Sequence, residues 1–218
     1  MKRFTRNLLI LRDLHSSTTL FREVPKDLKG KKHSSQLWLA RQLKDPYVEM
    51  ARKENYRCRS AYKLLEINDK FKILQPGYIV IDCGAAPGSW TQVAIKTTNA
   101  NAKEDGDVGT VIAIDKQPIY PIEDMAPNAS GVRDLDHEMI IQLAYIALKF
   151  ALQTSEKDGT FVCKIWDGGK SQQFEKDLVK FYKYVKIIRP DATRDESTEK
   201  FFVARGFKGI KSTSSNTT

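Results

Sequence analysis

The chain has 218 residues, enough for one α/β domain with a hydrophobic core and an extension. It carries 36 Lys and Arg against 27 Asp and Glu, a formal net charge of +9. This excess favours a polyanionic partner, most simply nucleic acid, although charge alone does not exclude a solvated basic surface that binds nothing in particular. No apolar run approaches the roughly 18 residues that a membrane span needs, so we expect no span.

The cysteine and histidine contents exclude two further classes of protein. Cys58, Cys83 and Cys163 show no paired ligand spacing, and the chain has only 3 His. We therefore expect no metal site and no disulfide framework. Buried or partly buried thiols in a reducing compartment are the simpler interpretation.

The N-terminal segment differs from the rest in composition. From Met1 to about Arg22 the only acid is Asp13, and basic and hydroxyl residues are frequent. Four leucines could form one face of a short helix, namely Leu8, Leu9, Leu11 and Leu14. This composition predicts a mitochondrial targeting segment over 1–33, with a disordered basic arm that touches RNA as the alternative. At the other end, 209–218 is a polar segment that we expect to be disordered.

Between these ends, helical and strand patterns alternate along the chain. The helices are expected from Ser34 or Ser35, from Asp45-Pro46 to about Glu54, through Leu64–Phe71, and over 89–97, 135–153 and 171–182. The strands are expected over 78–83, 109–115, 159–166, 184–188 and 200–205. This alternation predicts a doubly wound, Rossmann-like α/β sheet with flanking helices over 34–208.

The most informative stretch is the loop Asp82-Cys83-Gly84-Ala85-Ala86-Pro87-Gly88-Ser89-Trp90, which follows an apolar strand. Small residues let the backbone approach a ligand closely, and ligands of such sheets bind beyond the carboxyl ends of the strands. The spacing is neither that of a dinucleotide fingerprint nor that of a P-loop. It suits a ligand without a pyrophosphate, such as S-adenosylmethionine, although an ordinary strand-to-helix turn is the alternative.

Other polar residues occupy positions that suit a site at the same edge. Asp115 ends the second expected strand and could accept hydrogen bonds from a ribose diol, or could cap a helix. Asp124 opens a loop with Pro127 and Asn128. Lys164 lies within an apolar strand, where a charged ammonium group is costly unless it is paired or deprotonated. A lone strand lysine is more often an edge residue, so Lys164 alone is weak evidence.

Taken together, the motifs resemble those of the FtsJ-type 2′-O-ribose RNA methyltransferases. The matching strings are Arg57–Leu64, Asp82–Trp90, Asp124–Asn128, the strand that contains Lys164, and Ser197–Phe201, in the family's order over roughly 34–206. The string around Arg57 and Arg59 is most similar to the mitochondrial branch, which methylates a uridine ribose of large-subunit ribosomal RNA.

The resemblance implies a fold, a cofactor and a set of site residues. It implies a catalytic tetrad of Lys63, Asp124, Lys164 and Glu199, S-adenosylmethionine as cofactor, and RNA contacts at Arg57 and Arg59. Lys164 would be the base that takes the proton of the ribose hydroxyl, with a pKa lowered by burial and by Lys63. We expect a monomer in the mitochondrial matrix, with large-subunit ribosomal RNA or a pre-ribosomal particle as partner. The implied cofactor contacts are Asp82, Gly84, Pro87, Gly88, Trp90, Asp115 and Asp124.

The chain departs from the family in one place. Relatives have a strand–helix–strand segment between the second strand and the loop of Asp124, but here only eight residues separate Asp115 from Asp124. A parallel crossover takes about a dozen residues or more, so this segment cannot supply the usual fourth strand. We therefore predict a segment missing between Glu123 and Asp124.

The missing segment leaves three interpretations. The chain is an internally shortened product, which we favour, or a diverged enzyme with a smaller sheet, or a non-catalytic RNA-binding or ribosome-assembly protein. A transfer RNA ribose methyltransferase is the alternative within the enzyme class. An absent central strand would leave backbone groups unpaired and apolar faces exposed, so we predict reduced stability and weak or absent activity.

Overall fold

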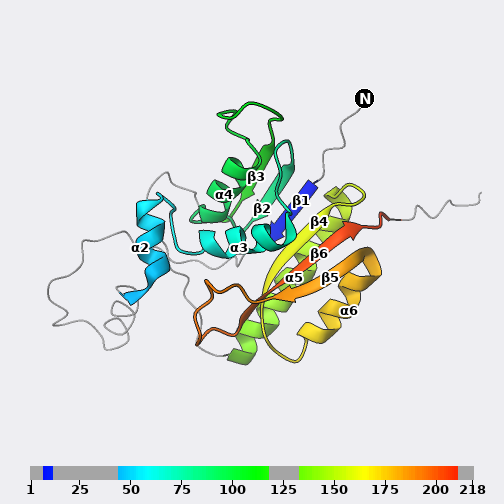
Figure 1. The fold of residues 1–218 in the computed structure, drawn as a ribbon. Helices are drawn as coiled ribbons and strands as arrows, with labels where there is room; N and C mark the ends of the chain where they lie inside the picture. The colour runs from blue at the N-terminus through cyan, green and yellow to red at the C-terminus, as the bar shows by residue number, and fades with distance from the viewer. Residues whose placement is uncertain (1–6, 12–43, 118–132, 211–218) are drawn as a thin grey trace, which may run out of the picture.

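A computed structural model of the protein describes residues 7–11, 44–117 and 133–210, which form one layered α/β unit (Figure 1). The strands are β1 (Asn7–Leu11), β2 (Ile79–Cys83), β3 (Thr110–Ile114), β4 (Thr160–Trp166), β5 (Tyr182–Ile188) and β6 (Glu199–Phe207). The helices are α2 (Pro46–Lys53), α3 (Ala61–Phe71), α4 (Ser89–Thr97), α5 (Arg133–Thr154) and α6 (Ser171–Phe181). The predicted alternation of strands and helices is confirmed, whereas the helix expected from Ser34 or Ser35 lies outside the described residues.

The strands form one sheet in the order β3-β2-β1-β4-β6-β5. β1, β2, β3 and β4 run parallel to one another, while β6 is antiparallel to both β4 and β5. The carboxyl ends of the parallel strands therefore share one edge of the sheet with the beginning of β6. Ligands of such sheets bind at this edge.

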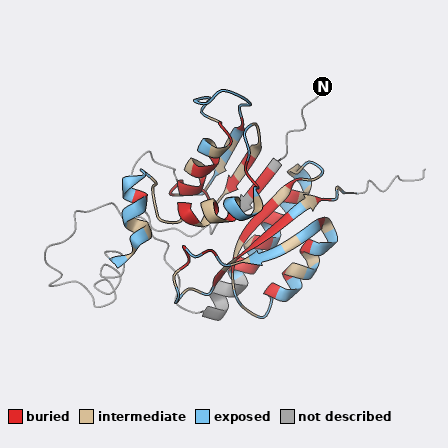
Figure 2. Ribbon diagram, in the orientation of Figure 1, coloured by how far each residue is buried: buried red, intermediate tan, exposed pale blue. Residues whose placement is uncertain are grey.

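Helices cover both faces of the sheet, so the core has two halves (Figure 2). On one face, α3 and α4 pack against β1, β2, β4 and β6 around Leu64, Trp90 and Val162. On the other face, α5 and α6 pack around Phe161, Phe174 and Phe202. These side chains are at most 1% exposed, which is the burial that a stable domain of this size needs.

Helix α2 begins where the sequence predicts. Asp45 is the N-cap of α2, where its carboxylate accepts a hydrogen bond from the backbone N–H of Tyr47 at 3.1 Å. Pro46 occupies the first turn, where its missing N–H costs nothing.

The N-terminal segment corrects two sequence-based expectations. Residues Asn7–Leu11 form a strand rather than part of a helix, and this strand pairs with β2 on one side and β4 on the other. Leu8 and Leu9 are each 1% exposed and enter opposite halves of the core. The expected unpaired backbone groups beside an absent central strand are therefore not found on β2 and β4, because β1 pairs with both.

Apolar exposure occurs instead at the edge strand β3. Ile112 and Ile114 are 46% and 45% exposed. They lie in register with Ile81 and Cys83 of β2, which pack against the core half formed by α5 and α6. The helices of that half extend over β1 and β4 but leave the outer side of β3 open to solvent.

None of the helices that the structure describes could cross a bilayer.

Candidate functional site

Residues of three elements meet at the carboxyl edge of the sheet. Lys63 comes from the first turn of α3, Lys164 from β4, and Glu199 from the beginning of β6. In the antiparallel ladder, Lys164 is opposite Phe201, two residues from Glu199. Side chains two apart on a strand share one face, so this register carries Glu199 and Lys164 toward the same side of the sheet.

Glu199 bridges the two lysines with its two carboxylate oxygens. Its Oε1 is 2.5 Å from Nζ of Lys63, and its Oε2 is 3.6 Å from Nζ of Lys164. The three side chains are only 13%, 16% and 9% exposed, for Lys63, Lys164 and Glu199 respectively. Two cations and one anion thus share a small, partly desolvated volume.

The environment of Lys63 disfavours its charged form. Burial lowers the pKa of the Lys63 ammonium group, and Lys164 and Arg59 lower it further, while Glu199 opposes the shift. The net pKa lies below the ordinary value for lysine because desolvation exceeds the attraction of the carboxylate. Burial and the neighbouring Lys164 therefore make two simultaneous positive charges unfavourable at this site.

The loop after β2 lies at the same carboxyl edge of the sheet and is built from small residues. Gly84 and Gly88 have φ angles of 75° and 105°, which favour glycine, and Gly88 is the N-cap of α4. The N–H groups of Gly84 and Ala85 donate to the carbonyl of Ile114 at 2.8 and 3.2 Å, and the Ala86–Pro87 peptide bond is cis. These contacts hold the loop against the end of β3.

Asp115 links the ends of β2 and β3. Its Oδ2 accepts the N–H of Ala86 at 2.9 Å, and its Oδ1 accepts the N–H of Gln117 at 2.8 Å. The half-buried carboxylate therefore sits against the glycine-containing loop, at the position where the sequence predicts an acceptor for a ribose diol.

Two residues of the predicted cofactor set have buried side chains. Asp82 is fully buried and accepts a hydrogen bond from Oγ1 of Thr91 at 2.7 Å, which fixes the first turn of α4. The indole of Trp90 is 1% exposed, donates to the carbonyl of Ser60 at 2.7 Å, and stacks on Phe201. Both side chains hold the loop and α4 in place. If Asp82 or Trp90 contacts a ligand directly, the contact would be made by its main-chain atoms.

The two arginines expected to bind RNA are engaged inside the protein. Arg57 donates through Nη1 to the carbonyl of Pro87 at 2.7 Å and so braces the loop. Arg59 donates to the carbonyl of Ala192 and pairs with Asp45 at 3.1 Å, with its side chain 15% exposed. Through these contacts, both guanidinium groups support the structure of the site.

The support around Arg59 was not predicted from the sequence. Asp45 also pairs with Nε of Arg194 at 3.2 Å, so one carboxylate joins α2, the start of α3 and the loop between β5 and β6. The same loop is held by Glu66, which accepts the N–H of Ala192 at 3.0 Å. These residues lie far apart in the sequence and have no characteristic spacing, so only the fold reveals the cluster.

Three of the four predicted catalytic residues are brought together, and the fourth cannot be placed. Asp124, which is also in the predicted cofactor set, lies outside the described residues. Of the residues that the structure does describe, no group of three or more His, Cys, Asp or Glu is placed to hold a metal ion.

Two cavities lie away from the lysine–glutamate cluster. One of about 290 Å³ is at the amino edge of the sheet, lined by Lys72, Tyr184 and Arg205 among others. The other, of about 280 Å³, lies between α5 and α6. We place the functional site at the carboxyl edge because the buried charges and the glycine-containing loop converge there.

A mostly parallel sheet covered on both faces, with a glycine-containing loop after β2 and a buried Lys–Glu–Lys cluster at the same edge, defines a Rossmann-like methyltransferase. Comparison with known sequences identifies the particular family. A sequence model described as FtsJ-like methyltransferase matches residues 56–124 and 121–207, and the chain belongs to this family.

The relatives agree with this assignment. The chain is 45% identical to "rRNA methyltransferase 2, mitochondrial" of Drosophila melanogaster, over 94% of this chain and 97% of the relative. It is 42% identical to "Ribosomal RNA large subunit methyltransferase E" of Cereibacter sphaeroides, over 84% of this chain and 88% of the relative. A structure described as a Plasmodium falciparum ribosomal RNA methyltransferase matches with a TM-score of 0.55 over 71% of this chain and 100% of that one, at 22% identity, and supports the fold.

The comparisons also bear on the predicted missing segment. The family match falls into two stretches that meet at 121–124, where the sequence predicts the gap. The alignment with the Drosophila relative spans 242 positions, more than the 218 residues of this chain. The relative therefore carries residues that this chain lacks.

Proposed function

We propose that the chain is an S-adenosylmethionine-dependent 2′-O-ribose methyltransferase that acts on a uridine of mitochondrial large-subunit ribosomal RNA. The observation that carries this proposal is the bridge from Glu199 to Lys63 and Lys164 at the same edge of the sheet as the loop after β2. The names of the relatives in Drosophila and Cereibacter support the RNA substrate, and the former supports a mitochondrial location. The matrix is the compartment that we propose, with the protein acting as a monomer.

The lysine pair suits proton removal from a ribose hydroxyl. This hydroxyl is a weak acid and a poor nucleophile, so a base must take its proton as the oxygen attacks. Glu199 lies nearer to Lys63 than to Lys164, at 2.5 Å against 3.6 Å. We therefore assign the base to Lys164, whose Nζ is held less closely by the carboxylate, and assign to Lys63 the cation that orients Glu199. The proposed role of Asp124 is to orient the same amines.

The loop after β2 fits a sulfonium nucleoside better than a dinucleotide. Its glycines permit close approach of a ligand, and it has no lysine at the position where a P-loop grips phosphate. Gly84, Pro87 and Gly88 would hold the cofactor through the main chain, and Asp115 would accept from its ribose. When bound, S-adenosylmethionine supplies an electrophilic methyl group. The chain's contribution is to align the hydroxyl oxygen with that group and to remove its proton.

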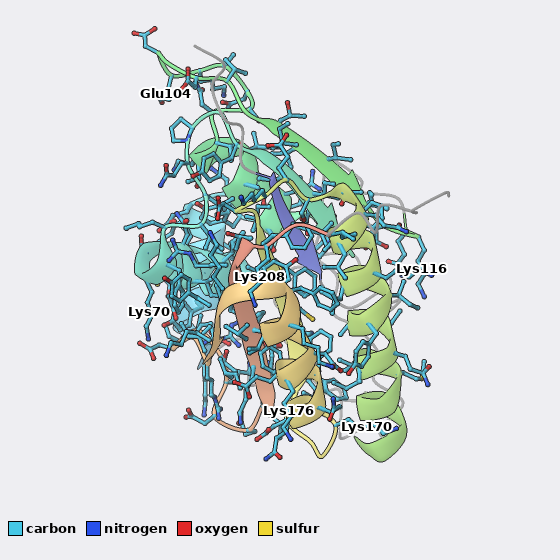
Figure 3. The ribbon with its side chains drawn as sticks, turned by 90° about the vertical axis from the view of Figure 1, so that its right-hand side faces the viewer. Lys70, Glu104, Lys116, Lys170, Lys176 and Lys208 are labelled. Carbon is cyan, nitrogen blue, oxygen red and sulfur yellow. The ribbon has the colours of Figure 1, made fainter. Side chains whose placement is uncertain are left out.

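The test is methyl transfer from labelled S-adenosylmethionine to large-subunit ribosomal RNA. We expect Lys164→Ala to lose incorporation by about 10²-fold or more, because a general base contributes 10²–10⁴-fold. Lys176→Ala is the matched control, since Lys176 is an exposed lysine of α6 (Figure 3), which packs on the opposite face of the sheet from the helix that carries Lys63. Equal incorporation by the wild type and Lys164→Ala would remove Lys164 from the mechanism.

The choice of RNA in this assay separates the alternatives. Incorporation into transfer RNA rather than ribosomal RNA would assign the enzyme to the other substrate. Binding of RNA with no incorporation by the wild type would favour the non-catalytic assembly protein. Mapping the methylated nucleotide by alkaline resistance then tests the 2′-oxygen and the uridine.

A further inference from the structure

Among the strands that the structure describes, the N-terminal strand β1 alone connects the two parts of the sheet. In the strand order, β2 and β3 lie on one side of β1, and β4, β6 and β5 lie on the other. Every described residue pairing between these two parts passes through Asn7–Leu11, with Leu9 opposite Ile81 on one side and Phe161 on the other. Without β1, two strands and three strands would remain as separate ribbons.

The two parts carry different halves of the proposed site. The β2–β3 part carries the loop of Gly84–Gly88 and Asp115, which would bind the cofactor. The β4–β6 part carries Lys164 and Glu199. β1 therefore sets the spacing between the methyl donor and the base, because neighbouring strands lie at a fixed distance of about 4.8 Å.

β1 is also built into the core on both faces. Leu8 packs with Val80, Val162 and the helices α3 and α4. Leu9 packs on the other face with Phe161, Cys163 and the helix α5. Two adjacent leucines, each 1% exposed, are what a central strand buried on both faces requires.

We infer that Asn7–Leu11 is a permanent strand of the folded domain, which positions the two halves of the site, and that N-terminal processing leaves it in place. The composition of 1–33 predicts a targeting segment, so the same residues would serve import first and the sheet afterwards. A cut after Leu11 would remove the central strand. Any cut has to fall before Asn7. The processing part of this inference rests on the proposed mitochondrial location, whereas the strand part does not.

Hydrogen exchange of the full, unmodified chain tests the strand part. We expect the amides of Leu8–Leu11 to exchange as slowly as those of Val80–Asp82 and Phe161–Cys163, at least about 10³-fold slower than an unstructured peptide, since a central strand opens only with the sheet. Exchange of the N-terminal amides at the peptide rate, with β2 and β4 still protected, would overturn the inference.

A charge placed in β1 tests its positioning role. Leu8→Asp should speed exchange in β2 and β4 by at least tenfold, because the carboxylate cannot be accommodated between α3, α4 and the sheet. Leu8→Ala is the milder variant if Leu8→Asp does not fold, and it should move the same amides in the same direction. Ile146→Asp is the matched control on α5, where the side chain is 65% exposed, and it should leave those amides unchanged. An equal effect of the two Asp variants would contradict the role of β1.

Import of the full chain into isolated mitochondria tests the processing part. The intact mass of the recovered protein should retain Asn7–Leu11, whether the chain is uncut or cut before Asn7. A mature chain that begins after Leu11 would overturn this part. Failure of import would count against the proposed location, and the exchange experiments would then still decide the strand part.

Discussion

At the scale of single residues, Glu199 has the most consequential position in the site. It is the anion shared by two lysines, and all three side chains are largely removed from water. Removing one member of a buried charge group costs more than the group itself contributes, because uncompensated charges remain. We therefore expect Glu199 to affect both the proposed proton transfer and the stability of the edge where β6 begins.

We expect Glu199→Gln to reduce methyl transfer by about 10²-fold, because a neutral amide cannot orient two ammonium groups as a carboxylate does. It should also lower the free energy of unfolding by about 3 kcal/mol, since Lys63 and Lys164 would lose the carboxylate that bridges them. The pKa of Lys63 should fall further, because Glu199 is the group that raises it.

Denaturant titration and labelled methyl transfer measure the two effects of Glu199→Gln. Glu196→Gln is the matched control, since Glu196 is an exposed carboxylate of the loop that leads into β6. If both variants kept wild-type stability and activity, Glu199 would have neither role.

At the scale of elements, a single carboxylate joins the two helices on one face of the sheet. Asp177 of α6 accepts from the hydroxyl of Tyr145 on α5 at 2.7 Å and from Nζ of Lys180 at 2.6 Å. The hydrogen bonds from Lys180 and Tyr145 lower the pKa of Asp177 to about 2. Burial, with the same hydrogen bond, raises the pKa of Tyr145 to about 12.

The lowered pKa of Asp177 predicts a pH-dependent contribution to stability. A carboxylate with a folded-state pKa below its unfolded value stabilises the fold above the unfolded pKa and loses this effect as the pH falls through the folded pKa. Asp177→Asn should therefore be less stable than the wild type at pH 7, and the difference should shrink between about pH 3.8 and pH 2. Urea titrations at several pH values measure this, with Asp195→Asn, at an exposed position, as the control. A difference that persists unchanged at pH 2 would contradict the ionic origin.

Most elements could be predicted because their signals are local. The expected helix over 89–97 is α4, Ser89–Thr97, and the expected strand over 159–166 is β4, Thr160–Trp166, because a turn and an apolar run mark their ends. β1 could not be predicted in this way. Leu8 and Leu9 fit a helix face or a strand equally well. The strand forms because Asn7–Leu11 pairs with both β2 and β4, which are distant in the sequence.

The site shows the same division between local and non-local signals. The meeting of Lys63, Lys164 and Glu199 followed from motifs that resemble a known family, and the structure brings these three together. The pairing of Asp45 with Arg59 and Arg194 had no signal, because it depends on how α2 and a distant loop pack. Sequence patterns thus indicated the reacting groups, while the groups that hold them required the fold.

At the scale of the whole molecule, exposed lysines lie on helices of both faces of the sheet in the described part of the chain. Figure 3 labels Lys70 on α3, Lys170 and Lys176 at α6, and Lys208 after β6. With a net charge of +9, we expect such a surface to attract RNA through many phosphates, with little dependence on base sequence.

This charge predicts binding of large-subunit RNA that depends steeply on salt. We expect the affinity to fall by at least about tenfold between 50 and 200 mM salt, because each phosphate contact releases counterions. Filter binding or fluorescence anisotropy over a salt series measures the slope. An affinity independent of salt would indicate that the basic surface does not take part.

The parallel pairing of β1 has a consequence for the order in which the protein can be assembled. Asn7–Leu11 is made early during synthesis, yet one of its partners, Thr160–Cys163, is made about 150 residues later. Synthesis proceeds at roughly 5–20 residues per second, so many seconds pass between the synthesis of β1 and that of its partner strand β4. Because its contacts are among the least local in the domain, its insertion is a slow step during which a chaperone would find an apolar segment to hold.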